Sequence, residues 1–376
     1  MIRLSAEFVR GQFPAFREPS LRDWAHFENA GGSFACRYVI WRLHRFYRER
    51  KVQPFGPFPA SEVAGEEMDD ARRRLALVLG VSAEDLSFGP STTANVYVLA
   101  QAFRQILRPG EAIVVTDQDH EANSGAWRRL GEAGVEVREW RMDPETGALD
   151  TEALETLLQD GAVRLVAFPH CSNIVGEIND AARICRMVRR AGAYSCVDGV
   201  SLAPHGLPDI GAIAPDIYLF STYKTYGPHQ GIMVVRRAVA DTLPNQSHWF
   251  NAAEIRKKLV PAGPDHAQVA ALAGIADYIE ALDVQHFASG GAPDTRAARV
   301  HDLMRQREQA LIAPLLDYLR ARNDVRVLGP TDPERRAPTI AIHCDRPGEA
   351  LAAELAADMG MGGGGHLYAR RLVEAT

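Results

Sequence analysis

One lysine, Lys224, lies in the turn 221–228, Ser-Thr-Tyr-Lys-Thr-Tyr-Gly-Pro, between the apolar segments 216–220 and 231–235. Both segments are short and bounded by turn residues, which predicts buried strands. An amine between aromatic side chains at the end of a core strand is partly desolvated, and desolvation lowers the pKa of a lysine and favours its nucleophilic form. Most lysines in turns are solvated, but the surroundings of Lys224 favour covalent chemistry.

Polar side chains follow other apolar segments of the chain in the same way. They are Thr92 and Thr93 at the start of a helix, and His120, Asn173 and Asp198 after the segments 112–116, 163–168 and 193–197. Taken singly, each has a structural explanation as a helix cap, a turn former or a hydrogen-bonding histidine. In a parallel sheet, however, the carboxyl ends of the strands meet at one edge, where ligands bind.

Together these groups fit one cofactor, pyridoxal 5′-phosphate (PLP). The pyridine nitrogen of PLP needs a carboxylate partner, and its phenolic oxygen needs a hydrogen-bond donor. The ring face needs a flat side chain to cover it, and the phosphate needs hydroxyls and helix N–H groups. The matching residues are, in that order, Asp198, Asn173, His120, and Thr92, Thr93 and Ser221. Lys224 supplies the amine for the aldehyde, so the residues predict PLP held by a Schiff base.

The elements that position these residues alternate along the chain. Strands are predicted at 112–116, 135–140, 163–168, 193–197, 216–220 and 231–235, and helices at 61–80, 95–103, near 126, from 151, at 180–190 and at about 267–282. This alternation predicts an α/β fold with a parallel sheet covered on both faces. A Gly/Pro-rich break at 289–293 precedes another long helix, strands near Val325 and at 339–343, and a helix from Glu349, which predict a smaller α+β domain.

The composition excludes several functional classes. The chain has 376 residues, 46% of them hydrophobic, and a formal net charge of -6, which argue for a soluble protein without a nucleic-acid or membrane surface. No apolar run has the length of a membrane span, and the N-terminal segment is amphipathic and carries an acid early, so it does not resemble a signal peptide. The five cysteines contain no Cys-x-x-Cys pair, so we expect a cytoplasmic protein with no disulfide or zinc framework.

Two motifs carry a resemblance to a known family. Val-Asp-Gly at 197–199 and Ser-x-x-Lys-x-Tyr-Gly-Pro at 221–228 resemble, at this spacing, the class V aminotransferase family of fold type I PLP enzymes, in particular its cysteine desulfurase-like subgroup. The likeness extends from segment 27–32 through Tyr368. It implies a large domain at 20–285, with a mainly parallel seven-stranded sheet in an αβα sandwich, and a small domain made of 1–19 and 286–376. It also implies a homodimer with shared active sites.

The resemblance implies a role for each matching residue. Lys224 corresponds to the lysine of the internal aldimine, Asp198 to the partner of the pyridinium nitrogen, and His120 to the stacking histidine, and these three are the implied catalytic residues. The other implied cofactor-binding residues are Thr92, Thr93, Asn173, Ser201, Ser221 and Tyr223. The implied substrate-binding residues are Ala30, Gly31, His366, Tyr368 and Arg370, and no metal is implied.

Several positions depart from the family pattern. Ser201 stands in place of a glutamine, Tyr223 in place of a histidine, and Gly263-Pro264 in place of a Gly-Thr that reaches the phosphate across the dimer. The segment 363–368, Gly-Gly-Gly-His-Leu-Tyr, replaces an Arg-x-Gly-His-x-Cys. In the family this arginine binds the substrate carboxylate, and here its position is a glycine, so Arg370 or Arg371 is the nearest candidate for that role. The family cysteine attacks the substrate sulfur, and here its position is Tyr368.

We therefore expect a PLP-dependent transferase or lyase that acts on a small amino acid through an external aldimine and a Cα carbanion, with transamination, elimination or racemisation to follow. A cysteine desulfurase or selenocysteine lyase-type C–S(e) lyase is the alternative, for which Cys171 and Cys344 are weak substitutes for the missing thiolate. A catalytically degenerate PLP-fold binding protein is a second alternative.

Overall fold

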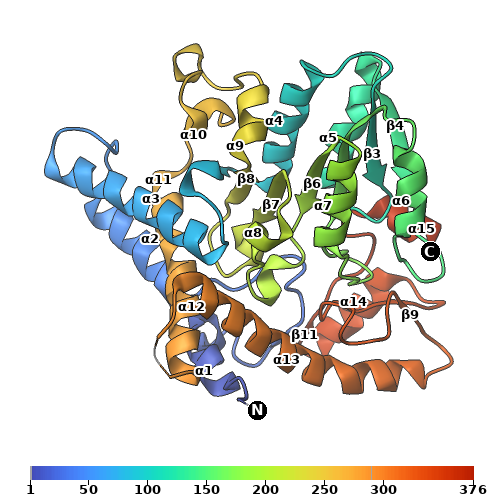
Figure 1. Ribbon diagram of the computed structural model, residues 1–376. Helices are drawn as coiled ribbons and strands as arrows, with labels where there is room; N and C mark the ends of the chain where they lie inside the picture. Colours follow the sequence, from blue (N-terminus) through green and yellow to red (C-terminus); the bar gives the residue numbers. More distant parts are fainter. Residues whose placement is uncertain (1, 289) are drawn as a thin grey trace.

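A computed structural model describes residues 2–288 and 290–376. Its centre is a seven-stranded sheet with the order β2-β8-β7-β6-β5-β3-β4, in which β8 runs antiparallel to its two neighbours and the other neighbouring pairs are parallel. The strands are β2 (Leu86–Gly89), β3 (Ala112–Thr116), β4 (Glu136–Trp140), β5 (Val163–Pro169), β6 (Tyr194–Asp198), β7 (Ile217–Ser221) and β8 (Gly231–Val235). This mainly parallel sheet confirms the predicted α/β fold class (Figure 1).

Helices cover both faces of the sheet, because alternate residues of each buried strand point to opposite sides. Val114 of β3 packs in the core of one face and Val115 in the core of the other. The first face is covered by α2 (Arg37–Glu49), α3 (Pro59–Val78), α6 (Thr151–Leu158), α7 (Ala181–Arg190), α8 (Ile210–Ile213), α11 (His266–Ala271) and α12 (Ala273–His286). The second is covered by α4 (Thr92–Arg104), α5 (Glu121–Arg128), α9 (Arg237–Thr242) and α10 (Ile255–Lys258).

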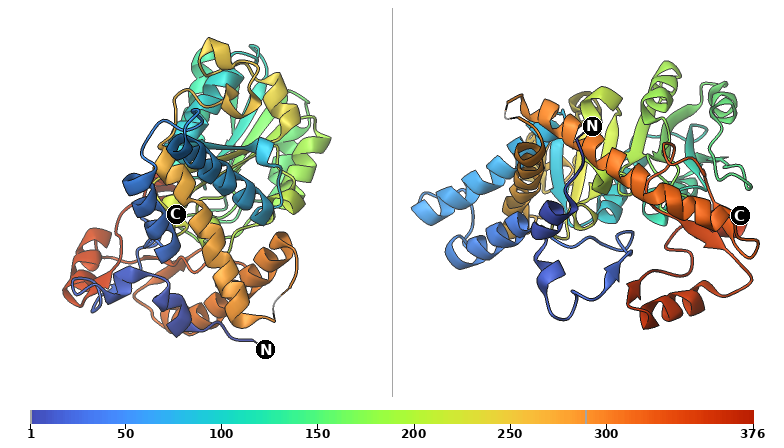
Figure 2. Two further views of the ribbon diagram at one scale, coloured as in Figure 1. Left: turned by 90° about the vertical axis from the view of Figure 1, so that its left-hand side faces the viewer. Right: turned by 90° about the horizontal axis from the view of Figure 1, so that it is seen from below.

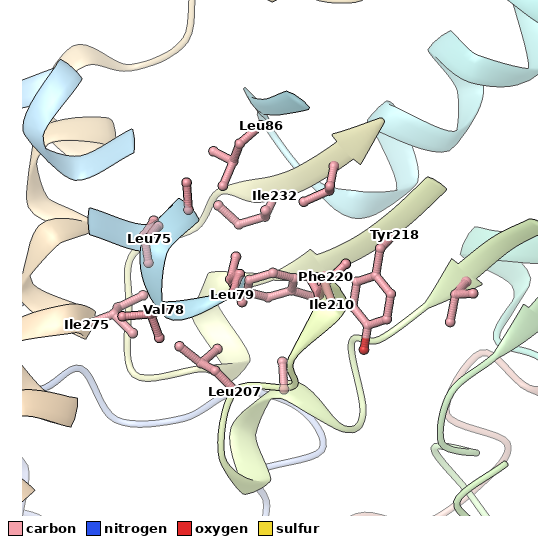
Figure 3. Packing of buried hydrophobic residues seen from close by; sticks show 14 of the residues in the cluster. Leu75, Val78, Leu79, Leu86, Leu207, Ile210, Tyr218, Phe220, Ile232 and Ile275 are labelled. Atoms are coloured by element: carbon pink, nitrogen blue, oxygen red, sulfur yellow. The ribbon is translucent and has the colours of Figure 1, made fainter. Parts of the chain in front are cut away.

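The first face has a closely packed apolar core. Leu75 and Leu79, at the C-terminal end of α3, are buried together with Phe220 and Ile232 from the neighbouring strands β7 and β8 (Figure 3). This packing fixes β7, and it therefore also fixes the turn after Ser221 that carries Lys224.

The C-terminal part surrounds one end of the sheet. The long helix α13 (Pro293–Arg320) crosses beneath the sheet and leads to the antiparallel pair β9 (Arg326–Leu328) and β10 (Ala341–His343) (Figure 2). The remaining elements are α14 (Gly348–Ala357), β11 (Gly360–Met361), α15 (Arg370–Ala375) and, at the N-terminus, α1 (Ala6–Gly11) and β1 (Ala25–His26). β1 pairs with β11 in parallel, so a segment near the N-terminus and a segment of the C-terminal part lie side by side. The boundaries 1–19, 20–285 and 286–376 stay predictions.

Two parts of the secondary structure differ from the prediction. The helix expected at 267–282 is two helices, α11 and α12, divided at Leu272, and a Cβ at Gly274 just beyond would lie 2.5 Å from the main-chain nitrogen of Val39 in α2. The short edge strand β2 and the helix α2 were not predicted. Ser289, the first residue of the predicted break, lies outside the described residues. No helix in the described part of the chain is long and apolar enough to cross a bilayer.

Candidate active site

The carboxyl ends of the parallel strands open onto one cavity, with about 420 Å³ of empty space including its open side. Every residue that the sequence predicts to bind the cofactor lies on it. The lining residues are Thr92, Thr93, Asp119, His120, Ala122, Pro169, Cys171, Asn173, Asp198, Val200, Ser201, Ser221, Tyr223 and Lys224. We call this space the inner cavity.

Lys224 ends the short 3-10 turn 222–224 that directly follows β7. Its side chain is buried, and Nζ lies 5.9 Å from the centre of the Tyr223 ring. Burial lowers the pKa of Lys224 below its ordinary value, and the nearby Asp198 and Glu28 carboxylates act against this shift. A lowered pKa leaves more of the amine unprotonated and able to react near neutral pH.

The lysine turn is held by an N-terminal segment far away in the sequence. The main-chain nitrogen of Ser33 donates to the Tyr223 carbonyl at 2.9 Å, and the Asn29 side chain donates to the Lys224 carbonyl at 3.3 Å. Between them, Ala30 and Gly31 are brought to the mouth of the site. The position of Lys224 is therefore fixed from two sides, by β7 and by the segment 29–33.

Asp198 is the last residue of β6 and is buried at the bottom of the inner cavity. One carboxylate oxygen, Oδ1, accepts a hydrogen bond from the Val200 main-chain nitrogen at 2.8 Å. Burial raises the pKa of Asp198 to about 6, although the Val200 hydrogen bond and the charge of Lys224 favour the anion. At neutral pH the group is thus a buried anion, which is what a cationic ring nitrogen requires.

A second buried carboxyl, Asp119, lines the same cavity beside Asp198. Its Oδ2 accepts a hydrogen bond from the Asn123 side chain at 2.7 Å, while its Oδ1 is buried without a partner among the described residues. Burial and, after it, the charge of Asp198 raise the pKa of Asp119 well above its ordinary value. Two adjacent buried carboxyls do not both ionise easily, so Asp198 carries the charge and Asp119 the proton.

His120 caps the N-terminus of α5, where its Nδ1 accepts a hydrogen bond from the Ala122 main-chain nitrogen at 3.0 Å. An accepting Nδ1 places the proton of the neutral ring on Nε2. Burial and, second, the charge of Lys224 lower the pKa of His120 to about 4. The imidazole is therefore neutral at physiological pH, which suits a flat side chain covering an aromatic ring.

Asn173, in the turn after β5, joins the cavity to the C-terminal segment. Its Nδ2 donates to the Leu367 carbonyl at 2.9 Å, and the main-chain nitrogen of Glu121 donates to the Tyr368 carbonyl at 2.8 Å. Through these contacts the segment 367–368 closes one side of the site. The Tyr368 ring lies 5.3 Å from that of His120 and stays 70% exposed.

The opposite end of the inner cavity combines hydroxyls with a helix N-terminus. Ser91 caps α4 by accepting a hydrogen bond from the Ala94 main-chain nitrogen, and the hydroxyls of Thr92 and Ser221 lie 2.7 Å apart. A Cβ at Gly231 would lie 2.4 Å from the Ser91 carbonyl carbon, so only glycine lets β8 begin this close to the helix start. Hydroxyls and helix N–H groups that meet at one point are groups of the kind that bind a phosphate.

A larger outer cavity, of about 1550 Å³, continues from Lys224 toward the surface. Ala30, Gly31 and Tyr368 line it, as the sequence predicts for substrate-binding residues. The structure places the other two predicted substrate-binding residues elsewhere, and their role stays a prediction. Arg370 points away and pairs with Glu374 at 2.6 Å, because consecutive residues of a helix point in different directions, and Arg371 lines the cavity instead. His366 accepts a hydrogen bond from the Tyr368 main-chain nitrogen outside the lining of either cavity.

The sequence analysis missed some residues of the site. Asp119 follows β3 immediately, a position that identified Asp198 after β6, so the same signal was present. Tyr97, Arg128 and Arg129 reach the outer cavity from α4 and from the end of α5. Their spacing within helices gives no sign of this, because a cavity-facing and a solvent-facing arginine look alike in sequence.

The sheet order and the polar groups at its carboxyl edge define the fold of the type I PLP-dependent enzymes. The model of the family "Aminotransferase class-V" matches residues 25–289. The chain therefore belongs to the class V aminotransferase family, whose members are PLP-dependent transferases and lyases. This confirms the family, the fold class and the class of enzyme predicted from the sequence.

Individual relatives cover different shares of the chain. It is 29% identical to "Aminotransferase-like protein FGM3" of Gibberella zeae over 98% of this chain and 90% of that protein. It is 32% identical to a "Cysteine desulfurase" of Serratia proteamaculans over 63% of this chain and 60% of that protein. Among solved structures, the apo cysteine desulfurase of Thermococcus onnurineus NA1 superposes with a TM-score of 0.84 at 21% identity, covering 100% of this chain and 92% of that one.

Proposed function

We propose that this chain binds PLP through Lys224 and acts at the Cα atom of an amino acid. The observation that carries the proposal is the convergence of an amine, a buried carboxylate, a neutral imidazole and paired hydroxyls on one cavity. These groups come from the ends of three strands, β3, β6 and β7, and from the N-termini of two helices, α4 and α5, so a shared structural role would not explain them together.

The side chains present fit this cofactor. Nδ2 of Asn173 donates one hydrogen bond, to the Leu367 carbonyl, among the described residues, so its second N–H is available for the ring oxygen. The Thr92 and Ser221 hydroxyls, whose side-chain partners within residues 2–288 and 290–376 are only each other, suit a phosphate. Asp198 matches a cationic nitrogen in charge and in burial, as Lys224 matches an aldehyde.

When bound, PLP supplies an aldehyde for covalent attachment and a ring that withdraws electrons from Cα. Nζ of Lys224 would accept the Cα proton of the substrate, which its lowered pKa favours. The Asp198 carboxylate would hold a proton on the ring nitrogen, and the neutral His120 would cover the ring without adding a positive charge near it. Tyr368, at the edge of the outer cavity, would limit access of water.

Cleavage of a C–S bond is the second candidate, favoured by the relatives named cysteine desulfurase. Neither candidate thiol of this chain is placed and ionised as a persulfide step requires. Cys171 lines the inner cavity, but burial raises the pKa of its thiol to about 12, so almost none is thiolate at neutral pH. Cys344 follows β10 and lies outside both cavities. Transamination, or elimination without a protein thiolate, is therefore the chemistry we favour.

The test is to incubate the purified, PLP-loaded protein with L-cysteine and with other L-amino acids. A shift of the visible absorption band with any amino acid, and release of pyruvate or of an oxo acid, support the favoured chemistry. With a thiol reductant such as dithiothreitol present to supply two electrons, stoichiometric alanine with sulfide identifies a desulfurase. A protein that stays colourless with added PLP contradicts the proposal and leaves the fold as a binding module.

A further expected result concerns the phosphate end of the cavity. Thr92→Val keeps the shape of the side chain but removes the hydroxyl, and a hydrogen bond to a charged group is worth about 1.5–3 kcal/mol. We expect the affinity for PLP to fall at least roughly tenfold, and to fall further in the double variant with Ser221→Ala. Equilibrium titration of the cofactor-free protein measures this, with Thr156→Val on α6 as the control. An unchanged affinity in the double variant would exclude phosphate binding here.

The homodimer with shared sites and the cytoplasmic location belong to this proposal and stay predictions. Large exposed aromatic side chains, among them Trp41, Trp249 and Phe250, are compatible with a partner subunit.

A further inference from the structure

Several arginines line the outer cavity. Arg128, Arg129 and Arg371 line it together with Lys224, His120 and Asn173. An amino acid whose amine reacts at Lys224 brings a carboxylate into this space, and a guanidinium is the side chain that best pairs with it. The question is which arginine is free to do so.

The three guanidinium groups differ in what they already contact. Arg128 is mostly buried and is occupied by the Thr116 carbonyl and by Glu139, at 3.2 and 2.7 Å. Arg129 is 62% exposed and has Glu132 at 3.6 Å on the same turn. Arg371 has Glu121 at 3.7 Å, too far for a good hydrogen bond, and both of these side chains are about half exposed.

The backbone around Arg371 is firmly placed. Its neighbours Ala369 and Leu372 are almost fully buried in a small core with Ile174 and Val175. Ile174 and Val175 lie in the same turn as Asn173, whose Nδ2 donates a hydrogen bond to the Leu367 carbonyl. The start of α15 is thus fixed to the cavity wall.

The loop 362–365 leaves little room for an alternative cation. A Cβ at Gly364 would lie 2.4 Å from the carbonyl carbon of Gly348, and one at Gly363 would lie 2.9 Å from Oε2 of Glu28. The backbone of this loop packs against a neighbouring backbone and an acid, so a carboxylate finds no donor side chain there.

We propose that Arg371 binds the carboxylate of the amino-acid substrate, and that Glu121 is the counter-ion that the substrate carboxylate replaces. The proposal rests on the proposed function and deepens it, because it makes the protein selective for amino acids over amines. Glu121 holds the guanidinium near the cavity in the empty protein, and the weak pairing lets a bidentate carboxylate exchange with it.

The experiment compares amino acids with the amines that lack only the carboxylate. The PLP-loaded protein is titrated with the twenty L-amino acids, with ethylamine as the counterpart of alanine and cysteamine as that of cysteine, and the apparent Kd is read from the shift of the visible band. We expect Arg371→Gln to raise the Kd of the amino acids roughly 10- to 100-fold and to leave the Kd of the amines unchanged. Arg370→Gln, one residue away on the outer side, is the matched control.

Each other outcome bears on the proposal. The proposal is overturned if Arg371→Gln weakens the binding of amino acids and amines equally, or weakens neither. It is also overturned if Arg370→Gln weakens amino-acid binding as much, or if no amino acid shifts the visible band of the wild type. Glu121→Gln is expected to tighten amino-acid binding severalfold, and weakening would contradict the counter-ion role. Arg371→Lys should keep part of the selectivity, and an unchanged melting temperature excludes misfolding. A wild type with no visible band at all instead refutes PLP binding, so the two failures are distinct.

Discussion

Replacement of Lys224 by alanine should abolish the visible absorption of the PLP-bound protein and lower turnover at least about 10⁴-fold. Two contributions disappear at once. The covalent link to the cofactor is lost, and so is the base at Cα, since no other amine lines the inner cavity in the described part of the chain. A positioned general base alone contributes about 10²–10⁴-fold, and the lost covalent attachment adds to it.

The matched control is Lys257→Ala, which removes an exposed lysine of α10 and should change neither the spectrum nor the rate. Non-covalent binding of PLP should persist in Lys224→Ala, because the contacts of the ring and the phosphate remain. A small primary amine added in solution should restore part of the rate by taking over the proton transfer. A Lys224→Ala variant that keeps the band of a lysine-bound cofactor would show that another amine is the attachment point.

Asp198→Asn should have opposite effects on two properties of the protein. It should weaken PLP binding by at least roughly 100-fold, because a buried cation then loses its anionic partner, which costs about 3–5 kcal/mol when one member of a buried pair is removed. It should also stabilise the cofactor-free protein near neutral pH. Titration calorimetry or absorbance gives the first effect, and denaturant unfolding gives the second.

The sign of the stability effect follows from the raised pKa. Burial moves the pKa of Asp198 from 3.8 to about 6, so below pH 4 the carboxyl is protonated in both the folded and the unfolded chain and no charge is buried. Between pH 4 and pH 6 the unfolded chain releases the proton first, and stability therefore falls as the pH rises. Above pH 6 the folded protein bears the full cost of a buried anion, about 2–3 kcal/mol.

The asparagine variant should lose this pH dependence and be more stable than the wild type above pH 6 by about that amount. Asp119→Asn provides a comparison. Burial and the charge of Asp198 raise the pKa of Asp119 well above its ordinary value, so this carboxyl also costs stability near neutral pH, and its amide should likewise stabilise the cofactor-free protein there. If neither amide variant stabilises the protein above pH 6, the pKa values of the two carboxyls are not raised by burial.

The chemistry of the inner cavity was predictable because its signals are local. Asp198, Asn173 and Lys224 each follow a short apolar strand, and right-handed crossovers bring the carboxyl ends of parallel strands to one edge. Thr92 could be read from a helix start in the same way. Strand length, turn residues and caps depend on neighbouring residues only, so the sequence contains them directly.

The outer cavity was only partly predictable, because it depends on side-chain direction and on contacts between distant segments. Arg370 and Arg371 are adjacent and identical in type, and only the packing of Leu372 decides which one faces the cavity. The hydrogen bond from Asn173 to the Leu367 carbonyl joins residues 194 positions apart, and no local pattern encodes it.

The sequence by itself therefore determined which residues could hold the cofactor, because the type of each side chain and its place after a strand suffice for that. The tertiary structure decided the charge of each of these groups and the shape of the substrate space. The pKa values of Asp119, Asp198 and His120 follow from how deeply each is buried and from the charge beside it, and burial exists only once the chain has packed.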